Sequence, residues 1–488
     1  ALVAAAVAIA ARDGGRAAAD QADPASRADA LFAAYTRPGS PGCAAGVMRD
    51  GALVFARGYG SANLDYDIPI TPRTVFDIGS VSKQFTAAGI FLLARDGRLS
   101  LDDDVRKWVP ELPDYGTPIT IRHLLHHTSG LRDYLVLMDL AGLNYEDIHP
   151  EAEIVGLIAR QRALNFRPGT EHLYSNSGYL LLAVIGARAA GEPFGRLLAR
   201  RIFAPLGMTA TRVFDDRTAV VRDRAIGYAP AGAGFRVDYY PNFDLPGDGQ
   251  VYTTIEDLAK WDRNFDEPIV GGRALVDDLL RRGRLADGRE IPYAGALVHG
   301  RYRGRPIVGH GGSWAGFRAH YVRFPTERLS AAVFCNVRTA DAAALARGLA
   351  AIWLGDRLGP ADPADEPQGG SAAQDEGRSA GGEPASGQVR LGEYAGRYYS
   401  DELDATYTLT VENGGLTARV RWREPRALRA AGRDRFRLGP VILAFERRGG
   451  RISGFTASAG RVREIRFVRV EPPRSDPQAA LWRRPREW

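Results

Sequence analysis

A stretch with almost no residues suited to a core divides the chain. Residues Gly359 to Gln388 are mainly Gly, Ala, Pro, Ser, Asp and Glu. Such a composition buries too little apolar surface to offset the entropy of folding. We therefore interpret residues 358–388 as a disordered linker. The chain has 488 residues, more than one core usually holds, so a separate domain is expected on each side.

The part after the linker, residues 389–472, consists of short segments in which apolar and polar residues alternate. Glycine-containing turns such as Asn413-Gly414-Gly415 and Arg448-Gly449-Gly450 separate several of them. This pattern predicts a small all-β barrel, because closure removes exposed strand edges. The Arg- and Pro-rich residues 473–488 are expected to form a disordered tail.

The part before the linker, residues 23–357, has strand patterns at its two ends and helical patterns between them. A hairpin is predicted around Asp50-Gly51, and a helix from Ser82 to Gly97. Strands return at 307–310, 317–324 and 331–336, followed by a helix over 342–354. This order predicts an α+β fold, with an antiparallel sheet built from both ends, flanking helices and a helical lobe.

The first residues resemble part of a signal peptide. Ala1 to Ala11 are almost all small or apolar, and small residues follow. We interpret residues 1–22 as a truncated signal segment and expect a secreted or periplasmic bacterial protein. No other stretch approaches the roughly 18 apolar residues of a membrane span, so no transmembrane anchor is expected.

Charge and cysteine usage narrow the possible partners. The net charge is +6, but it comes from dispersed arginines rather than a basic block, so no nucleic-acid partner is expected. Lysine occurs only at Lys83, Lys107 and Lys260. Cys43 and Cys335 show no zinc-ligand spacing; we favour two buried free thiols, with one disulfide as the alternative.

Gly79-Ser80-Val81-Ser82-Lys83 is the first chemical motif, at the predicted start of a helix. A hydroxyl there lies in the positive end of the helix dipole. Lys83 follows Ser80 by about one turn, so both side chains share a face. A neutral Lys83 in that position can accept the Ser80 proton and activate the nucleophile. Alone, this spacing is more typical of a serine that caps a helix and a solvent-exposed lysine.

Two further motifs carry polar groups. Tyr174-Ser175-Asn176 precedes a helix; Tyr174 can exchange a proton with a lysine, and Asn176 can donate to a substrate carbonyl or hold Lys83. His310-Gly311-Gly312-Ser313 is predicted at a strand end, where Gly312 lets a substrate backbone approach. The backbone N–H groups of Ser313 and Ser80 are candidates for an oxyanion hole.

Together these segments resemble the class C β-lactamase-like branch of the penicillin-recognising serine enzymes. The resemblance covers about residues 28–354 and includes FDIGSVSKQFTA, YSNSGYLLLAVIG and GHGGSWAGFRAHYVRFP. It implies an acyl-enzyme on Ser80, with Lys83 and Tyr174 as general base and acid and His310 on the opposite wall of the cleft. It implies no cofactor or metal. More weakly, the C-terminal part resembles the lipocalin-like domains of some D-aminopeptidase relatives.

The third motif departs from that of the β-lactamases, which usually have Lys-Thr-Gly there. His310-Gly311-Gly312 resembles the D-aminopeptidase and esterase members instead. A mostly neutral histidine binds a carboxylate less firmly than a lysine near pH 7, so weak or absent β-lactamase activity is expected.

Two other patterns are set aside. Gly377-Arg378-Ser379-Ala380-Gly381 matches the GxSxG signature but lies in the linker, without the strand and helix that the motif needs. His123, His126 and His127 have helical spacing, but the nearest carboxylate, Asp133, follows a turn, so a metal site is not favoured.

The leading hypothesis is a serine hydrolase that acts on small esters, amides or peptides, of the esterase or D-aminopeptidase type. The alternative is a penicillin-binding receptor for cell-wall fragments that deacylates slowly or not at all. The oligomeric state is left open.

Overall fold

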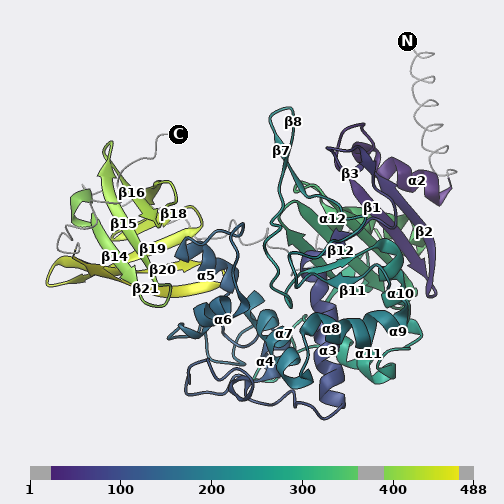
Figure 1. The fold of residues 1–488 in the computed structure, drawn as a ribbon, viewed down its shortest axis with the longest axis horizontal. Coiled ribbons are helices and arrows are strands. Elements are labelled where there is room, and N and C mark those ends of the chain that lie inside the picture. The colour runs from purple at the N-terminus through teal and green to yellow at the C-terminus, as the bar shows by residue number, and fades with distance from the viewer. Residues whose placement is uncertain (1–22, 361–389, 472–488) are drawn as a thin grey trace. The chain divides into compact units, whose positions relative to one another are not determined.

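The computed structural model describes residues 23–360 and 390–471 (Figure 1). The expected signal segment, nearly all of the expected linker and the tail lie outside these ranges. The described residues form two compact units. One consists of residues 23–109, 119–129 and 178–360, and the other of residues 110–118, 130–177 and 390–471.

A six-stranded antiparallel sheet forms the centre of the first unit. Its strand order is β10-β11-β12-β13-β1-β2, so strands from both ends of the unit's sequence meet in the middle, as the sequence predicts. The strands are β1 (Cys43–Arg49), β2 (Ala52–Tyr59), β10 (Val298–Tyr302), β11 (Arg305–Trp314), β12 (Phe317–Phe324) and β13 (Leu329–Cys335).

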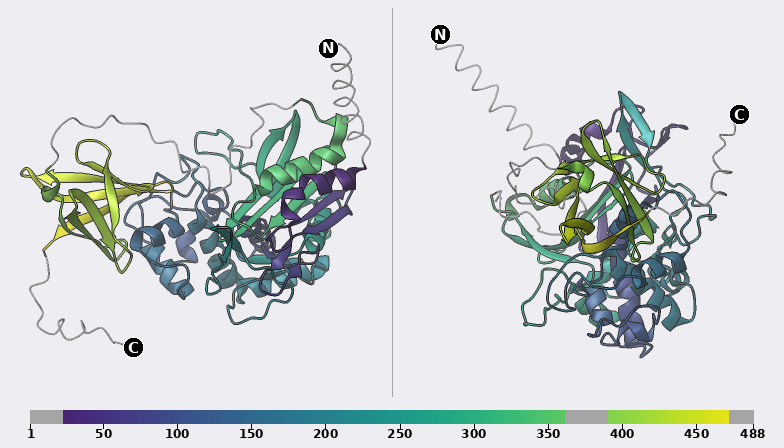
Figure 2. Two further views of the ribbon diagram at one scale, coloured as in Figure 1. Left: turned by 90° about the horizontal axis from the view of Figure 1, so that it is seen from above. Right: turned by 90° about the vertical axis from the view of Figure 1, so that its left-hand side faces the viewer.

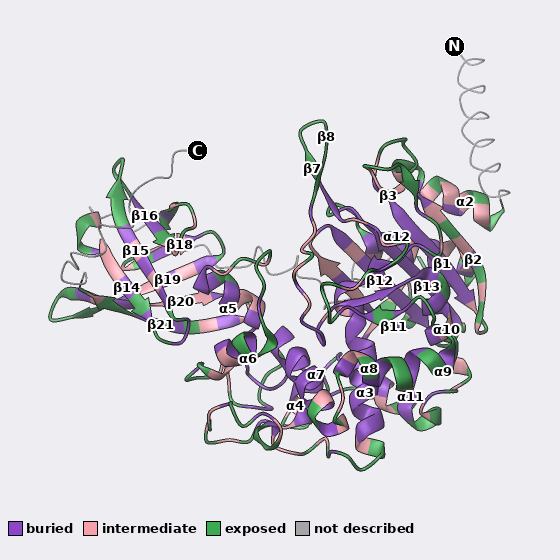
Figure 3. Ribbon diagram, viewed as in Figure 1, coloured by how far each residue is buried: buried purple, intermediate pink, exposed green. Residues whose placement is uncertain are grey.

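Strand β1 is buried on both faces (Figure 3). Side chains alternate across a strand, so Cys43, Ala45 and Val47 share one face. They belong to a core that includes residues of α12 (Ala342–Leu354) and Ala28 of α2 (Pro24–Leu31). A Cβ added at Gly46 would lie 2.4 Å from Cγ2 of Ile255, the first residue of α10 (Ile255–Asp266). The glycine thus lets α10 pack closely on the sheet.

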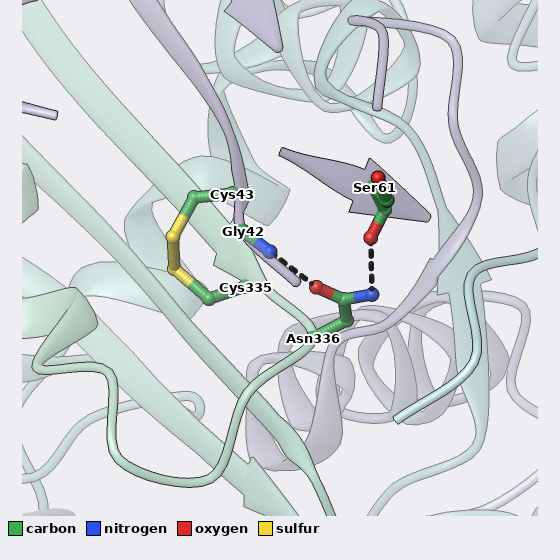
Figure 4. The surroundings of a disulfide bond; sticks show 5 residues. All are labelled: Gly42, Cys43, Ser61, Cys335 and Asn336. Carbon is green, nitrogen blue, oxygen red and sulfur yellow. Dashed lines mark hydrogen bonds between the residues drawn. A yellow bond between two sulfur atoms is a disulfide. The ribbon is translucent and has the colours of Figure 1, made fainter. Parts of the chain in front are cut away.

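The two cysteines form a disulfide, which corrects our preference for free thiols (Figure 4). Cys43 and Cys335 lie directly opposite each other in the β1–β13 register, although 292 residues separate them in sequence. Beside them, the Asn336 side chain accepts a hydrogen bond from the Gly42 N–H and donates one to the Ser61 carbonyl. The pairing depends on strand register, which sequence spacing did not reveal.

The remaining elements of the first unit are helices and short strands. The helices are α3 (Lys83–Arg95), α4 (Ile121–Leu125), α8 (Phe194–Leu198), α9 (Ala204–Leu206) and α11 (Gly272–Leu280), together with most of α7 (Asn176–Ala190). The short strands are β3 (Ser61–Asn63), β4 (Ile68–Pro69), β5 (Phe76–Asp77), β6 (Arg212–Val213), β7 (Tyr228–Ala231), β8 (Gly234–Val237) and β9 (Val251–Thr253).

The second unit combines two helices with a closed eight-stranded barrel, which Figure 2 shows from two further directions. The helices are α5 (Tyr134–Ala141) and α6 (Glu151–Ala159). Each barrel strand pairs with the next, and β14 pairs with β21 to close the ring. The strands are β14 (Gly396–Ser400), β15 (Ala405–Glu412), β16 (Gly415–Val420), β17 (Arg426–Ala430), β18 (Arg435–Leu438), β19 (Val441–Arg448), β20 (Arg451–Ala459) and β21 (Val462–Val470).

Aromatic rings pack against one another in the core of the barrel. Phe455 lies 4.6 Å from Phe467 and 5.1 Å from both Tyr398 and Phe445, measured between ring centroids. All four residues are buried. An eight-stranded barrel is just wide enough for its interior to be filled by side chains, and these rings form such a packed core.

The architecture agrees with the predicted fold class: an α+β unit whose antiparallel sheet is built from both ends of its sequence, and an all-β barrel after it in the chain. Within the described ranges, no helix is both long and apolar enough to cross a membrane.

Candidate active site

Ser80 lies in a short 3₁₀ turn directly before the helix that the sequence predicts from Ser82. The turn, η2, spans Gly79–Ser82, and α3 begins at Lys83. With three residues per 3₁₀ turn, side chains at positions i and i+3 lie almost in line. The Nζ of Lys83 is accordingly 3.0 Å from the Oγ of Ser80. The predicted proximity of the Ser80 hydroxyl and the Lys83 amine is therefore present.

The Lys83 side chain is completely buried. Its Nζ donates a 2.6 Å hydrogen bond to the backbone carbonyl of Asp248 and lies 5.6 Å from the centre of the Tyr179 ring. These contacts, together with the Ser80 hydroxyl, fix the amine at the nucleophile.

Strand β11 runs directly against the nucleophile turn. A Cβ at Gly312 would lie 2.0 Å from the backbone oxygen of Ile78, and one at Gly79 would lie 2.8 Å from the backbone nitrogen of Ser313. Gly79 also has a φ of +49°, which favours glycine. The third motif lies at the C-terminal end of β11, as predicted, and is itself part of the strand. Gly312 is required by contact with the protein's own backbone at Ile78.

From His310 to Trp314, β11 pairs with a strand on one side only. The β10–β11 pairing ends at Gly309, whereas the β11–β12 pairing continues to Trp314. Among the described residues, this section of β11 therefore forms a sheet edge beside Ser80. An open edge can pair with an extended peptide-like backbone.

His310 is held in one neutral tautomer. Its Nδ1 is 2.6 Å from the Gly311 carbonyl, which only accepts, so Nδ1 carries the proton. Burial, followed by the nearby Lys83 charge, lowers the pKa of His310 to about 3. In the neutral ring Nε2 is an acceptor, so the Tyr293 hydroxyl, 3.1 Å away, donates to it. Both ring nitrogens are thus bonded within the protein.

Asp77 lies just before the nucleophile turn and is buried. One carboxyl oxygen accepts from the Gly79 N–H at 2.8 Å, and the other has no hydrogen-bond partner. Burial raises the pKa of Asp77 to about 7, against the opposing effect of the Gly79 hydrogen bond. The turn therefore rests on a carboxyl that is largely protonated below neutral pH.

Tyr174 and Asn176 belong to the second unit, where their surroundings can be described. Tyr174 lies in the irregular segment just before α7, as predicted, and Asn176 is the first residue of that helix. The backbone N–H of Asn176 donates to a carboxyl oxygen of Asp133 at 2.8 Å. The other oxygen of Asp133 caps α5 by accepting from the N–H groups of Leu135 and Val136. Asp133 thus connects the irregular segment that carries Tyr174, called here the tyrosine loop, to the start of α5.

His123 and His127 make capping and packing contacts that are typical of structural residues. His123 completes a capping box with Thr120 at the start of α4, and His127 packs against the rings of Tyr179 and Tyr293. In the part of the chain that the structure describes, no group of three His, Cys, Asp or Glu side chains is arranged to hold a metal. The GxSxG sequence lies outside the described residues.

The first unit thus brings together Ser80, Lys83, Gly312 and Ser313, with His310 two residues before Gly312 on β11. Tyr293 and Asp77 were not predicted from the sequence. Tyr293 gave no local signal because its contact with His310 depends on the tertiary fold. The role of Asp133 was not predicted either, although an aspartate before a helix is a common N-cap.

Comparison with known proteins gives the family. The beta-lactamase family profile matches residues 28–352. A D-aminopeptidase of Gluconobacter oxydans is 34% identical over 370 residues, which cover 74% of this chain and 69% of the relative. Penicillin-binding protein 4* of Bacillus subtilis is 31% identical over 298 residues, covering 57% of this chain and 64% of the relative.

Solved structures show the same fold. The octameric penicillin-binding protein homologue from Pyrococcus abyssi superimposes with a TM-score of 0.59 at 24% identity, covering 88% of this chain and 95% of that one. The D-amino acid amidase from Ochrobactrum anthropi SV3 superimposes with a TM-score of 0.56 at 23% identity, covering 68% and 98%. Given these matches and the serine–lysine pair, the chain belongs to the beta-lactamase family and is a serine hydrolase.

Proposed function

We propose that the enzyme hydrolyses small amides and esters through an acyl-enzyme on Ser80, with peptides or amides of D-amino acids as the favoured substrates. The observation that carries this proposal is the buried Lys83 amine, 3.0 Å from the Ser80 hydroxyl. A hydroxyl with an adjacent base is the arrangement that activates a serine. The D-aminopeptidase name of the Gluconobacter relative supports the substrate class.

The reaction has two halves. Ser80 Oγ attacks the substrate carbonyl carbon while Lys83 and Tyr174 take up its proton and deliver one to the leaving amine or alcohol. The C–N or C–O bond breaks and the acyl group stays on Ser80. Water then attacks the ester, its proton returns to Ser80, and the acid leaves. The N–H groups of Ser80 and Ser313 stabilise the oxyanion in both halves, and Asn176 orients the substrate carbonyl.

His310 supports a preference for substrates without a carboxylate near the reacting bond. Its ring is neutral, and both nitrogens are engaged by Gly311 and Tyr293. It therefore offers a substrate carboxylate neither a positive charge nor an N–H donor. Penicillins, which carry a carboxylate, should be poor substrates, and amides or esters should be favoured over peptides with a carboxylate next to the scissile bond.

We also propose that the enzyme works in an oxidising compartment, such as the periplasm or the cell exterior. The Cys43–Cys335 disulfide supports this, because structural disulfides are rare in the reducing cytosol. We further propose that the barrel is lipocalin-like. Each strand pairs with its sequence neighbour and the ring closes, which is the up-and-down topology shared by lipocalins.

The test is to measure hydrolysis of D-alanyl-p-nitroanilide, L-alanyl-p-nitroanilide and p-nitrophenyl acetate, with D-Ala-D-Ala and benzylpenicillin as carboxylate-bearing comparisons. We expect turnover of the D-anilide and the ester, with kcat/KM for the two carboxylate compounds lower by at least about 100-fold. Ser80→Ala should abolish turnover, whereas Ser453→Ala on the barrel should retain it.

Intact mass measured during turnover should show an acyl group on wild type and none on Ser80→Ala. A stable adduct without turnover would instead support the receptor function. Undiminished activity of Ser80→Ala would overturn the site, and efficient benzylpenicillin hydrolysis would overturn the role given to His310.

A further inference from the structure

An arginine from the barrel lies over the ring of Tyr174. Arg461 is in the turn between β20 and β21, and its guanidinium carbon is 4.8 Å from the centre of the Tyr174 ring. Tyr174 and Arg461 belong to the same compact unit. A cation over an aromatic face is attracted by the ring quadrupole, and the attraction strengthens when the pair is shielded from water. Arg461 therefore restricts how this ring can tilt.

The same guanidinium reaches the residue that anchors the tyrosine loop. Nη1 of Arg461 is 3.6 Å from Oδ2 of Asp133, whose side chain is fully buried. That oxygen also accepts the backbone N–H of Asn176, two residues after Tyr174. Arg461 thus interacts with the tyrosine loop twice, through the ring and through the carboxylate that fixes the loop's backbone.

The backbone that carries Arg461 is held in place as well. Asn165 donates from its side chain to the Arg461 carbonyl at 2.8 Å and accepts from the Arg463 N–H at 2.8 Å. One side chain therefore bonds to both sides of Val462. Hydrogen bonds that hold the supporting residue are the usual requirement for a precisely placed functional side chain.

A buried ion pair reinforces this contact. Arg132 and Glu402 are 2.7 Å apart, and their side chains are only 2% and 5% exposed. Arg132 also donates to the Arg463 carbonyl at 3.0 Å, and its own carbonyl accepts from the Ser177 hydroxyl at 2.6 Å. These bonds link the barrel, the residue before Asp133 and the first turn of α7. A charge buried this deeply is tolerated only when it is paired.

We propose that the barrel is a working part of the active site, and that Arg461 is a positioning residue for Tyr174. This inference rests on the proposed function, in which Tyr174 transfers a proton. Arg461 holds the phenol at the orientation needed for that transfer and does not itself touch the reacting atoms. The barrel thereby contributes to kcat in addition to stability.

The experiment is a double-mutant cycle on p-nitrophenyl acetate hydrolysis by the full chain. Arg461→Met keeps an unbranched side chain but shortens it and removes its charge and donors. We expect it to lower kcat about tenfold with KM changed less than twofold, because one cation–aromatic contact contributes energy of that size. Arg461→Lys, which keeps the cation, should recover most of the loss. Arg466→Met, an exposed position on β21, is the matched control and should behave as wild type.

The second arm places Arg461→Met in a Tyr174→Phe background. Phenylalanine keeps the ring but cannot transfer a proton, so removing Arg461 should no longer change kcat there. The thermal stability lost on removing Arg461 should be similar in both backgrounds, because the ring contact remains. An equal loss of kcat in both backgrounds would overturn the positioning role, as would wild-type kcat for Arg461→Met.

The two proposals fail in different ways. If Tyr174→Phe retains full activity, the proposed proton transfer is wrong and the positioning role is wrong with it. If Tyr174→Phe is inactive and Arg461→Met is fully active, only the role of the barrel is wrong. Should Arg461→Met fail to fold, Arg461→Lys alone tests the proposal, since a lysine that folds yet leaves kcat as low as expected for the methionine variant would contradict it.

Discussion

The nucleophile turn and the tyrosine loop are built in different ways. Close backbone contacts surround the Ser80 turn: the Asp248 carbonyl accepts from Lys83, and Gly312 lies against Ile78. Around Tyr174 the contacts are made by charged side chains, with Arg461 over the ring and Asp133 beneath the following backbone. The turn around Ser80 depends on close backbone packing, and the segment around Tyr174 depends on ion pairs that reach the barrel.

This difference determines which changes each region tolerates. Close backbone packing leaves no room for an added methyl group, but it does not depend on charge or salt. A buried ion pair is affected less by small changes in side-chain shape, but losing one charge leaves the other buried without a counter-charge. We therefore expect the nucleophile turn to be sensitive to added volume, and the tyrosine loop to be sensitive to charge.

The largest expected effect comes from adding one methyl group to the nucleophile turn. In Gly312→Ala the new Cβ would lie 2.0 Å from the Ile78 oxygen, so β11 and the Ser80 turn must separate. We expect kcat/KM for p-nitrophenyl acetate to fall by more than about 100-fold, because displacements near 1 Å at a reacting centre have effects of that size.

Gly249→Ala is the matched control. Gly249 follows Asp248, and its added Cβ would meet only the Gly79 oxygen at 4.0 Å. Activity within about threefold of wild type is expected, since this distance is ordinary van der Waals contact. Equal activity of the two variants would show that close packing of β11 against the turn is not what constrains the site.

Parts of both regions could be predicted from the sequence. The Ser80–Lys83 spacing specified a shared face, because neighbours three residues apart are brought together by any helical turn. The open edge of β11 and the Cys43–Cys335 pair required knowledge of strand register, which depends on residues distant in sequence. The contact of Arg461 with Tyr174 was the hardest to predict, because 287 residues separate them and no local sequence pattern indicates that they are close.

The second prediction concerns the buried ion pair between Arg132 and Glu402. Glu402→Gln preserves the shape of the side chain but leaves Arg132 buried without its counter-charge. We expect a loss of about 3 kcal/mol in the free energy of unfolding, which is typical for removing one partner of a buried pair. Urea unfolding at low and at high salt should give similar losses, since a buried pair is poorly screened.

The adjacent carboxylate supplies the control. Asp401 pairs with Arg162 on the surface, where the two side chains are 51% and 75% exposed. Asp401→Asn should therefore cost less than about 0.5 kcal/mol. If the two variants lost equal stability, burial of the Arg132–Glu402 pair would not be what distinguishes this region.

A pH-dependent effect is expected at Asp77, the buried carboxyl just before the Ser80 turn. Burial raises the pKa of Asp77 from 3.8 to about 7 in the folded protein. Between these values the folded state keeps a proton that the unfolded state loses, so the free energy of unfolding falls as the pH rises. Asp77→Asn removes this dependence. Its stability relative to wild type should therefore increase from pH 4 to pH 8, by at most about 4 kcal/mol.

Urea unfolding of wild type and Asp77→Asn at the two pH values measures this difference, and the exposed Asp65→Asn controls for the loss of a carboxyl elsewhere. Hydrolytic activity should change little, because asparagine can still accept the Gly79 hydrogen bond. A pH-independent difference in stability would mean that Asp77 titrates as an ordinary carboxyl. A large loss of activity would mean that the nucleophile turn requires a carboxyl after all, and that it shares the dependence on charge expected of the tyrosine loop alone.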